Sequence, residues 1–217
     1  MGLRTAILID GSYFLKRYRY VYPPPHDDPR TVARTMYNMV RAHAQDKYLH
    51  RIFYYDCHPF SKKVDKPLRD TPYDFAESDM YKFRIAFFNE LKRMRKVALR
   101  LGNIRDGHKW ILRPDKNQEL IDGRLKSEDL RSEHFTYDLR QKGVDIKIGC
   151  DIAALAFKQL VHQIILISGD SDFVPAAKVA RREGIDFVLD PMWNPISPEL
   201  FEHIDGLNST CPNPHKR

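Results

Sequence analysis

Two short apolar runs that each lead into an acidic residue beside a glycine most constrain the fold of this chain. The run Ile164–Ile167 leads into Ser168-Gly169-Asp170-Ser171-Asp172, and the run Thr5–Ile9 leads into Asp10-Gly11. A continuous apolar run of this length, bounded by a turn residue, predicts a strand that is buried on both faces. In an open α/β sheet, ligands bind beyond the carboxyl ends of the strands. We therefore expect the acids of both segments to lie at one binding edge.

Segments with helical spacing separate the predicted strands. Strands are predicted over residues 5–9, 52–55, 164–167 and 187–189, and helices over about 12–20, 29–44, 74–99, 151–160 and 172–184. The alternation over 144–148 favours a further short strand, with a helix start as the alternative. Asp28 and Pro29 form a typical helix start, while Asp151 and Asp172 are predicted N-caps and Gly184 a helix end. This alternation predicts an α/β fold with a mainly parallel central sheet and helices on both faces.

The middle of the chain carries an expected insertion. Asp106-Gly107 is a strong turn dipeptide and predicts a hairpin over Asn103–Pro114. The following stretch, Asp115–Glu133, is highly charged and lacks periodicity, which indicates an excursion over the surface. We expect one domain over residues 1–208 with an insertion around 101–133, and a flexible polar tail over 209–217.

Composition favours a basic cytoplasmic protein. Lys and Arg total 36 against 29 Asp and Glu, a net charge of +7, and such an excess favours a polyanionic partner. No stretch approaches the roughly 20 apolar residues of a membrane helix, so no membrane association is expected. The three cysteines have no paired spacing, which argues against a disulfide framework or a zinc site.

Four aspartates are the candidate metal ligands and catalytic residues. They are Asp10, Asp151, Asp170 and Asp172, with Asp145 as a fifth in reserve. Taken singly, each has a simpler explanation as a helix cap or turn residue. Together, carboxylates at strand ends and helix starts repel one another unless a cation lies between them. Hard oxygen ligands select Mg²⁺ or Mn²⁺, which can activate a water and neutralise charge on a phosphate.

Other residues beside these acids are candidate substrate contacts. The hydroxyls of Ser12 and Ser168 and the amine of Lys142 are suited to a phosphate, although turn formation and surface exposure explain them as well. Tyr13 and Trp110 could stack on a base, whereas burial is the commoner fate of such rings. Asp56 and Asp190 also follow strands, and their neighbours indicate ordinary loop exits.

Three motifs resemble the NYN domains, specifically the LabA-like branch of the PIN-like nuclease superfamily. They are Ile7–Ser12, Lys142–Asp151 with its two acids, and Leu166–Pro175. The resemblance implies a Rossmann-like PIN fold and a metal-dependent ribonuclease site. It matches Asp10, Asp151, Asp170 and Asp172 to the acids of that site and Asp145 to a further recurring acid. Tyr13 departs from the pattern, because the family usually has Asn there.

Three functions compete. The leading hypothesis is a Mg²⁺- or Mn²⁺-dependent endoribonuclease acting on single-stranded or structured RNA, with DNA an open alternative and an aromatic helix face open to a homodimer. The second is an inactive module that binds RNA or a partner protein, which the replacement of Asn by Tyr13 favours. The third, a phosphatase with an Asp nucleophile, ranks lowest, since Asp10-Gly11-Ser12 lacks the paired Asp-x-Asp that such enzymes commonly need.

Overall fold

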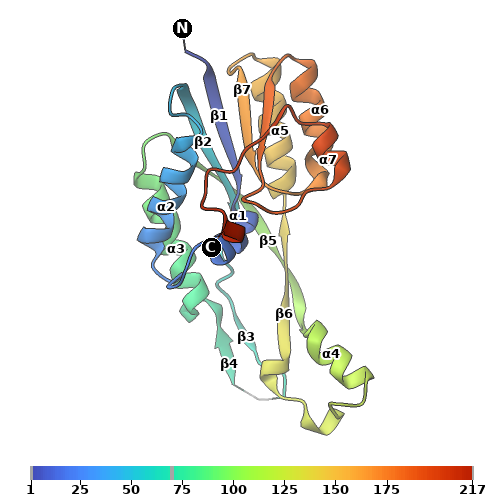
Figure 1. The fold of residues 1–217 in the computed structure, drawn as a ribbon. Helices are drawn as coiled ribbons and strands as arrows, with labels where there is room; N and C mark the ends of the chain where they lie inside the picture. The colour runs from blue at the N-terminus through green and yellow to red at the C-terminus, as the bar shows by residue number, and fades with distance from the viewer. Residues whose placement is uncertain (1, 69–70, 217) are drawn as a thin grey trace.

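A seven-stranded sheet forms the centre of the protein, as Figure 1 shows. The computed structural model describes residues 2–68 and 71–216. The strand order is β6-β5-β2-β1-β7-β8-β9. Only the β5–β6 pair is antiparallel, and all other neighbours in this sheet are parallel. The predicted α/β class with a mainly parallel sheet is therefore confirmed.

The elements alternate along the chain, with short connections outside one long arm. The strands are β1 (Arg4–Asp10), β2 (Tyr48–Cys57), β3 (Lys63–Asp65), β4 (Pro72–Asp74), β5 (Val97–Leu112), β6 (Phe135–Lys142), β7 (Gln163–Ile167), β8 (Asp186–Asp190) and β9 (Gly206–Leu207). The α-helices are α1 (Gly11–Val21), α2 (Pro29–Ala42), α3 (Asp79–Arg93), α4 (Pro114–Ile121), α5 (Val144–Phe157), α6 (Val174–Arg182) and α7 (Pro198–Glu202).

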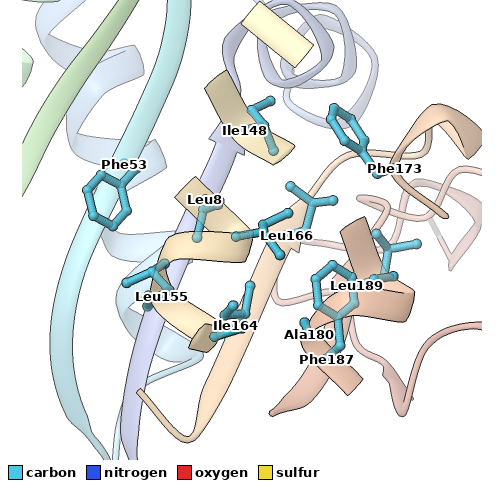
Figure 2. Close-up of a cluster of buried hydrophobic side chains, with 14 of the residues drawn as sticks. Leu8, Phe53, Ile148, Leu155, Ile164, Leu166, Phe173, Ala180, Phe187 and Leu189 are labelled. Atoms are coloured by element: carbon cyan, nitrogen blue, oxygen red, sulfur yellow. The ribbon is translucent and has the colours of Figure 1, made fainter. Parts of the chain in front are cut away.

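The central strands are buried on both faces, which explains their unbroken apolar sequences. In β1, Leu8 packs with the cluster on the α5 and α6 side, while Ile7 and Ile9 pack with the cluster under α1, α2 and α3. Figure 2 shows the first cluster, in which Leu8 and Leu166 lie near Leu155. Burying apolar side chains on both sides fixes the register of β1 and β7, and hence the position of the acids that follow them.

An arm extends beyond the carboxyl edge of the sheet. Strand β5 pairs with β2 as far as Gly102 and then continues to Leu112 in an antiparallel pair with β6. The small β3–β4 hairpin and helix α4 lie along this arm (Figure 1). The sheet thus carries an antiparallel extension built from β5 and β6, with α4 between them in the chain.

The predicted hairpin at Asp106-Gly107 is wrong, because both residues lie inside β5. A Cβ at Gly107 would come within 2.5 Å of the Asp138 carboxylate on β6, so glycine allows the close approach of two strands. The pairing register shifts between Asp106 and Trp110, and His108 has a φ of 53°. The dipeptide therefore marks an irregularity in a long strand.

The strand favoured over 144–148 is also wrong, and the alternative of a helix start is correct, since helix α5 begins at Val144. Val144 and Ile148 are buried one helical turn apart, while Ile146 is 72% exposed. Gly143, with a φ of 81°, precedes the helix, so Asp151 lies inside it and is not an N-cap. Likewise Asp170, and not Asp172, caps the short 3-10 turn before α6.

Two boundaries differ from the predictions. The helix expected over about 74–99 is shorter, because α3 ends at Arg93 and β5 begins at Val97. The segment expected to be a loose tail packs at its start, where the Thr210 hydroxyl donates to the carbonyl of Met39 and Cys211 is buried. No helix within residues 2–68 and 71–216 has the length and apolar character needed to cross a membrane.

Candidate functional site

The carboxyl ends of β1 and β7 meet at the centre of the sheet. Ile9 pairs with Ile167, so the chain leaves both strands at one level, into Asp10 and into Ser168. On the other side of β1, Asp10 is in register with Tyr55, directly before Asp56. Helix α5 starts at this edge, because β6 ends at Lys142 and only Gly143 intervenes. The neighbouring strands and this helix start gather five aspartates around one edge.

Asp10 is a largely buried carboxylate with an incomplete set of partners. One of its oxygens accepts the backbone N–H of Tyr13 at 3.1 Å and caps α1. The pKa of Asp10 is raised to about 6, chiefly by burial and in smaller part by the negative charges of Asp145 and Asp56. No Lys or Arg in the described residues forms an ion pair with it. Asp10 is therefore a destabilising charge at neutral pH.

Asp145 lies in the first turn of α5 and faces the same edge. Its pKa is raised by partial desolvation and then by the negative charges of Asp170 and Asp172. The positive end of the helix dipole acts in the opposite direction, yet the raised pKa shows that repulsion and desolvation prevail. These interactions connect the acids at the ends of β1 and β7 with the acid at the start of α5. The negative charge of Asp145 raises the pKa of Asp10, and the charges of Asp170 and Asp172 raise the pKa of Asp145.

Asp170 and Asp172 are exposed at the end of β7. The carboxylate of Asp170 accepts the N–H of Asp172 at 3.0 Å, which holds the turn. No cationic side chain among the described residues pairs with either of them. We call Asp10, Asp145, Asp170 and Asp172 the open acids, because none forms an ion pair with a cationic side chain in residues 2–68 and 71–216.

Asp56 differs from the open acids because its charge is compensated. Its carboxylate is fully buried and forms an ion pair with Arg84 of α3. It also accepts from the backbone N–H of Cys57 at 2.7 Å and from the Gln141 amide at 3.4 Å. Removing one of these partners would leave the buried Asp56 carboxylate uncompensated, which destabilises the folded state.

Asp151 is also compensated. It lies in α5 beyond Asp145, and its Oδ2 accepts from the Tyr55 hydroxyl at 2.8 Å and from Nε of Arg100 at 3.1 Å. The structure thus brings Asp10, Asp145, Asp170 and Asp172 together electrostatically, while the Asp151 carboxylate is held by groups of β2 and β5. Asp145, a reserve ligand on sequence grounds, has the more open environment of the two.

The candidate substrate contacts fall into two groups. Ser168 is fully buried and its hydroxyl accepts the N–H of Asp170, while the Tyr13 hydroxyl donates to the carbonyl of Pro191 at 2.7 Å. Both side chains therefore serve local packing. Lys142 is exposed, and the Ser12 hydroxyl donates to Oε1 of Gln141 at 3.1 Å. These two remain accessible beside the open acids.

Trp110 lies on the arm, away from the acids. It is eight residues beyond Gly102 on β5, a separation of about 25 Å along an extended strand. Its indole N–H donates to the carbonyl of Asp65 at 2.7 Å, and its ring packs edge-on against Tyr137. The ring therefore helps to hold the β3–β4 hairpin on the arm.

The donor set of the open acids fits a hard divalent cation. In the described ranges, no three His, Cys, Asp or Glu side chains lie close enough together to enclose a metal ion. Mg²⁺ usually keeps several waters and needs only one or two carboxylates. Asp10, partly desolvated and lacking a counterion, is a group that such a cation would stabilise. These acids therefore suit a divalent cation that keeps most of its bound waters and contacts one or two carboxylates.

Sequence reasoning missed Asp56, Arg84 and Gln141. Asp56 could have been found, because it follows an apolar strand as Asp10 does, but Cys57-His58 after it suggested a loop. Arg84 belongs to a basic helix face with no feature that distinguishes it from its neighbours. Gln141 reaches the site only because β6 pairs with β5 at the sheet edge.

These features define an α/β protein with an acidic site at the carboxyl edge of its sheet. The sequence model of the NYN domain matches residues 4–200. The chain therefore belongs to the NYN domain family, which is part of the PIN-like nuclease superfamily. No curated protein matches the chain. A crystal structure of a protein of unknown function from Vibrio parahaemolyticus aligns with a TM-score of 0.48 and 16% identity, covering 95% of this chain and 91% of that one.

Proposed function

We propose that this protein is a Mg²⁺- or Mn²⁺-dependent endoribonuclease of the LabA-like branch of the NYN domains. The observation that carries the proposal is the set of four open acids at the carboxyl edge of the sheet. A protein that used these carboxylates only as caps and turn residues would gain nothing from coupling Asp10 to Asp145 and Asp145 to Asp170 and Asp172. A cation between them removes the repulsion.

One or two of Asp10, Asp145, Asp170 and Asp172 would contact the ion directly, and the others would contact it through its bound waters. Asp10 would contact the ion while its carboxylate also accepts the backbone N–H groups of Tyr13 and Ser12 at the start of α1. Asp151 would join them through Oδ1, because Tyr55 and Arg100 both contact its Oδ2. When bound, the metal supplies a Lewis acid that activates a water and neutralises charge on the scissile phosphate. Ser12 and Lys142 are the accessible groups that would orient that phosphate.

A basic groove beside the acids supports a nucleic-acid substrate. This groove has a volume of about 850 Å³, and the cations Lys16, Arg19, Lys82 and Arg84 outnumber the acids Asp27 and Asp79 in its lining. Lys82 and Arg84 are already paired with carboxylates, so Lys16 and Arg19 are the cations left for a ligand. Lys16 and Arg19 lie one turn apart on the exposed side of α1, and neither has a carboxylate partner among the described residues. Cations without internal partners beside a metal-binding edge suit the phosphates of a strand that enters the site.

The decisive experiment is cleavage of single-stranded RNA in Mn²⁺ by the wild type and by Asp170→Asn. This substitution keeps size and exposure but removes one open charge. We expect loss of cleavage by at least about 100-fold with retained RNA binding, because removing a group that stabilises charge in the transition state has effects of that order. A DNA strand of the same sequence is the second substrate. Equal cleavage by both proteins would refute the proposal.

A matched pair of double variants tests the groove. Lys16→Ala/Arg19→Ala removes two groove cations, whereas Lys178→Ala/Arg182→Ala removes two exposed cations from α6. For single-stranded RNA, the slope of log K against log salt should decrease by about 1.4 in the first variant, since each lost phosphate contact contributes about 0.7. The control should keep the wild-type slope. An equal change in both would mean that the groove is not the path of the strand.

Two observations favour a second function, an RNA- or protein-binding module without catalysis. Tyr13 stands where the family usually has Asn and is packed against Gly169, where a Cβ would come within 2.7 Å of its hydroxyl. In addition, Asp151 is already neutralised by Arg100. RNA binding that persists in EDTA, with no cleavage in Mg²⁺ or Mn²⁺, would select this function.

A further inference from the structure

A small apolar cavity lies beside the acidic edge, between α3 and the base of the arm. It has a volume of about 190 Å³. Its apolar lining comes from Phe60, Phe75, Met80, Tyr81, Ile104 and Leu139. Asp56, Arg84 and Gln141 form its polar end. The nuclease chemistry proposed above uses none of the apolar residues, so the cavity needs its own explanation.

The size of the cavity limits what can occupy it. Pockets for drug-sized ligands have volumes of roughly 300–1,000 Å³, and this cavity is smaller. An apolar cavity of about 150 Å³ is sufficient for benzene. The space therefore suits one planar six-membered ring with small substituents. The apolar and aromatic side chains around it favour a flat ring over a charged group.

The polar end of the cavity can recognise carbonyl groups. The guanidinium of Arg84 carries five N–H donors, and Asp56 is its one hydrogen-bond partner among the described residues. Donors therefore remain for a ligand. Because Asp56 holds Arg84 by an ion pair and is itself buried, the guanidinium is positioned without a ligand. A ring with carbonyl oxygens on its edge would satisfy those donors.

A hydrogen-bonded chain links this polar end to Ser12, which follows the open acid Asp10 at the start of α1. Ser12, two residues after Asp10, donates to Gln141, and the Gln141 amide donates to Asp56. Met80 and Arg84 also line the basic groove, so the cavity and the groove adjoin. A strand whose phosphates lie in the groove would thus have the cavity within reach of one of its bases.

We propose that this cavity receives one unpaired pyrimidine base of the RNA strand. The ring would lie among Phe60, Phe75 and Leu139, with its carbonyl edge toward Arg84. This inference rests on the proposed function for the identity of the strand. It adds that the substrate must be unpaired at one position near the cut, because a base that enters a cavity cannot remain stacked and paired.

The test uses a 12-nucleotide oligouridine RNA and a series in which one uridine at a time is replaced by an abasic residue. Binding is measured by fluorescence anisotropy to the Asp170→Asn protein in Mg²⁺, so that the strand stays intact. We expect one position in the series to weaken binding by about 5- to 100-fold, the usual effect of one base that stacks in a protein site. Replacement at the ends of the strand should have little effect.

Filling the cavity should abolish this position-dependent effect. Leu139→Trp places an indole in the cavity, and Ile104→Phe is the second variant in case the first is poorly folded. Ile111→Trp is the matched control, because Ile111 lies on the same arm but is 40% exposed and outside the cavity. In the filled variants the intact and abasic RNAs should bind equally, whereas the control should keep the wild-type difference.

The outcomes separate this inference from the proposed nuclease. Cleavage by the wild type without any position-dependent abasic effect would overturn the base cavity and leave the nuclease standing. A position-dependent effect without cleavage in any metal would support the cavity and contradict the nuclease. An effect that persists in folded Leu139→Trp would place the base elsewhere, and absence of RNA binding would overturn both.

Discussion

Replacing Asp10 by Asn should make this protein more stable at neutral pH. Asn caps a helix as well as Asp does, so the hydrogen bond from the Tyr13 N–H can be kept. The substitution removes a carboxylate that is largely desolvated and close to the negative charges of Asp145 and Asp56. The only property that changes substantially is the charge.

The magnitude follows from the pKa of Asp10. The folded protein raises it from 3.8 to about 6, so the folded state binds the proton more tightly than the unfolded state. The contribution of Asp10 to the free energy of unfolding is therefore most favourable below pH 3.8 and is lost as the pH rises through 6. The shift corresponds to about 3 kcal/mol. This is an upper limit, because water reaches part of the side chain.

Urea denaturation of both proteins between pH 4 and pH 8 measures this difference. At pH 7 the Asn variant should be more stable by about 1–3 kcal/mol, which raises the melting temperature by up to about 10 °C in a chain of this length. At pH 4 the difference should fall below about 1 kcal/mol, since the folded protein then carries a protonated Asp10. Comparing the two proteins at each pH cancels the titration of all groups that do not interact with Asp10.

A divalent cation extends the same test. Mn²⁺ at millimolar concentration should stabilise the wild type at pH 7, because it binds only the folded state. It should stabilise the Asn variant less. Asp151→Asn is the control, since its carboxylate is paired with Arg100 and its loss should leave the stability unchanged or lower. If the Asp10 variant is no more stable than the wild type at pH 7, Asp10 is not an uncompensated charge and the reasoning fails.

Two further substitutions test the frame around the acids. Arg84→Ala leaves the buried Asp56 charge unpaired and should lower the free energy of unfolding by about 3–5 kcal/mol. The control Arg93→Ala removes a 75% exposed cation and should change the free energy of unfolding by less than about 1 kcal/mol. Similar losses in the two variants would show that Asp56 is not held by Arg84. Gly11→Ala would bring a Cβ within 2.6 Å of the Tyr55 carbonyl and should lower the free energy of unfolding by about 1–3 kcal/mol. The loss is measured as a lower urea midpoint, and an unchanged midpoint would contradict the close contact of α1 with β2.

Residues near one another in the chain made part of this fold predictable. The N-cap and proline at Asp28 and Pro29 identified the start of α2, and both β1 and β7 were visible as apolar runs. These signals depend on neighbours within a few positions, so the sequence contains them completely. Gly184, with its φ of 76°, likewise closes α6 as its position predicted.

Signals with two structural uses were misread. Asp106-Gly107 has the composition of a turn, but here the glycine lies under the Asp138 carboxylate of another strand. The alternation of Val144, Ile146 and Ile148 suits a strand, whereas the burial of the first and third also suits a helical turn. Only the partner that packs against such a segment decides between the two.

By itself, the sequence determined that acids follow the buried strands β1 and β7 and that the sheet is mainly parallel, because apolar runs and turn residues act locally. Tertiary structure alone decided which acids keep an open charge. Arg84 reaches Asp56 and Arg100 reaches Asp151 from other elements, while Asp10 and Asp145 have no such partner in the part of the chain that the structure describes. Compensation of a buried charge depends on distances across the fold, and those distances are set by how the helices and strands pack.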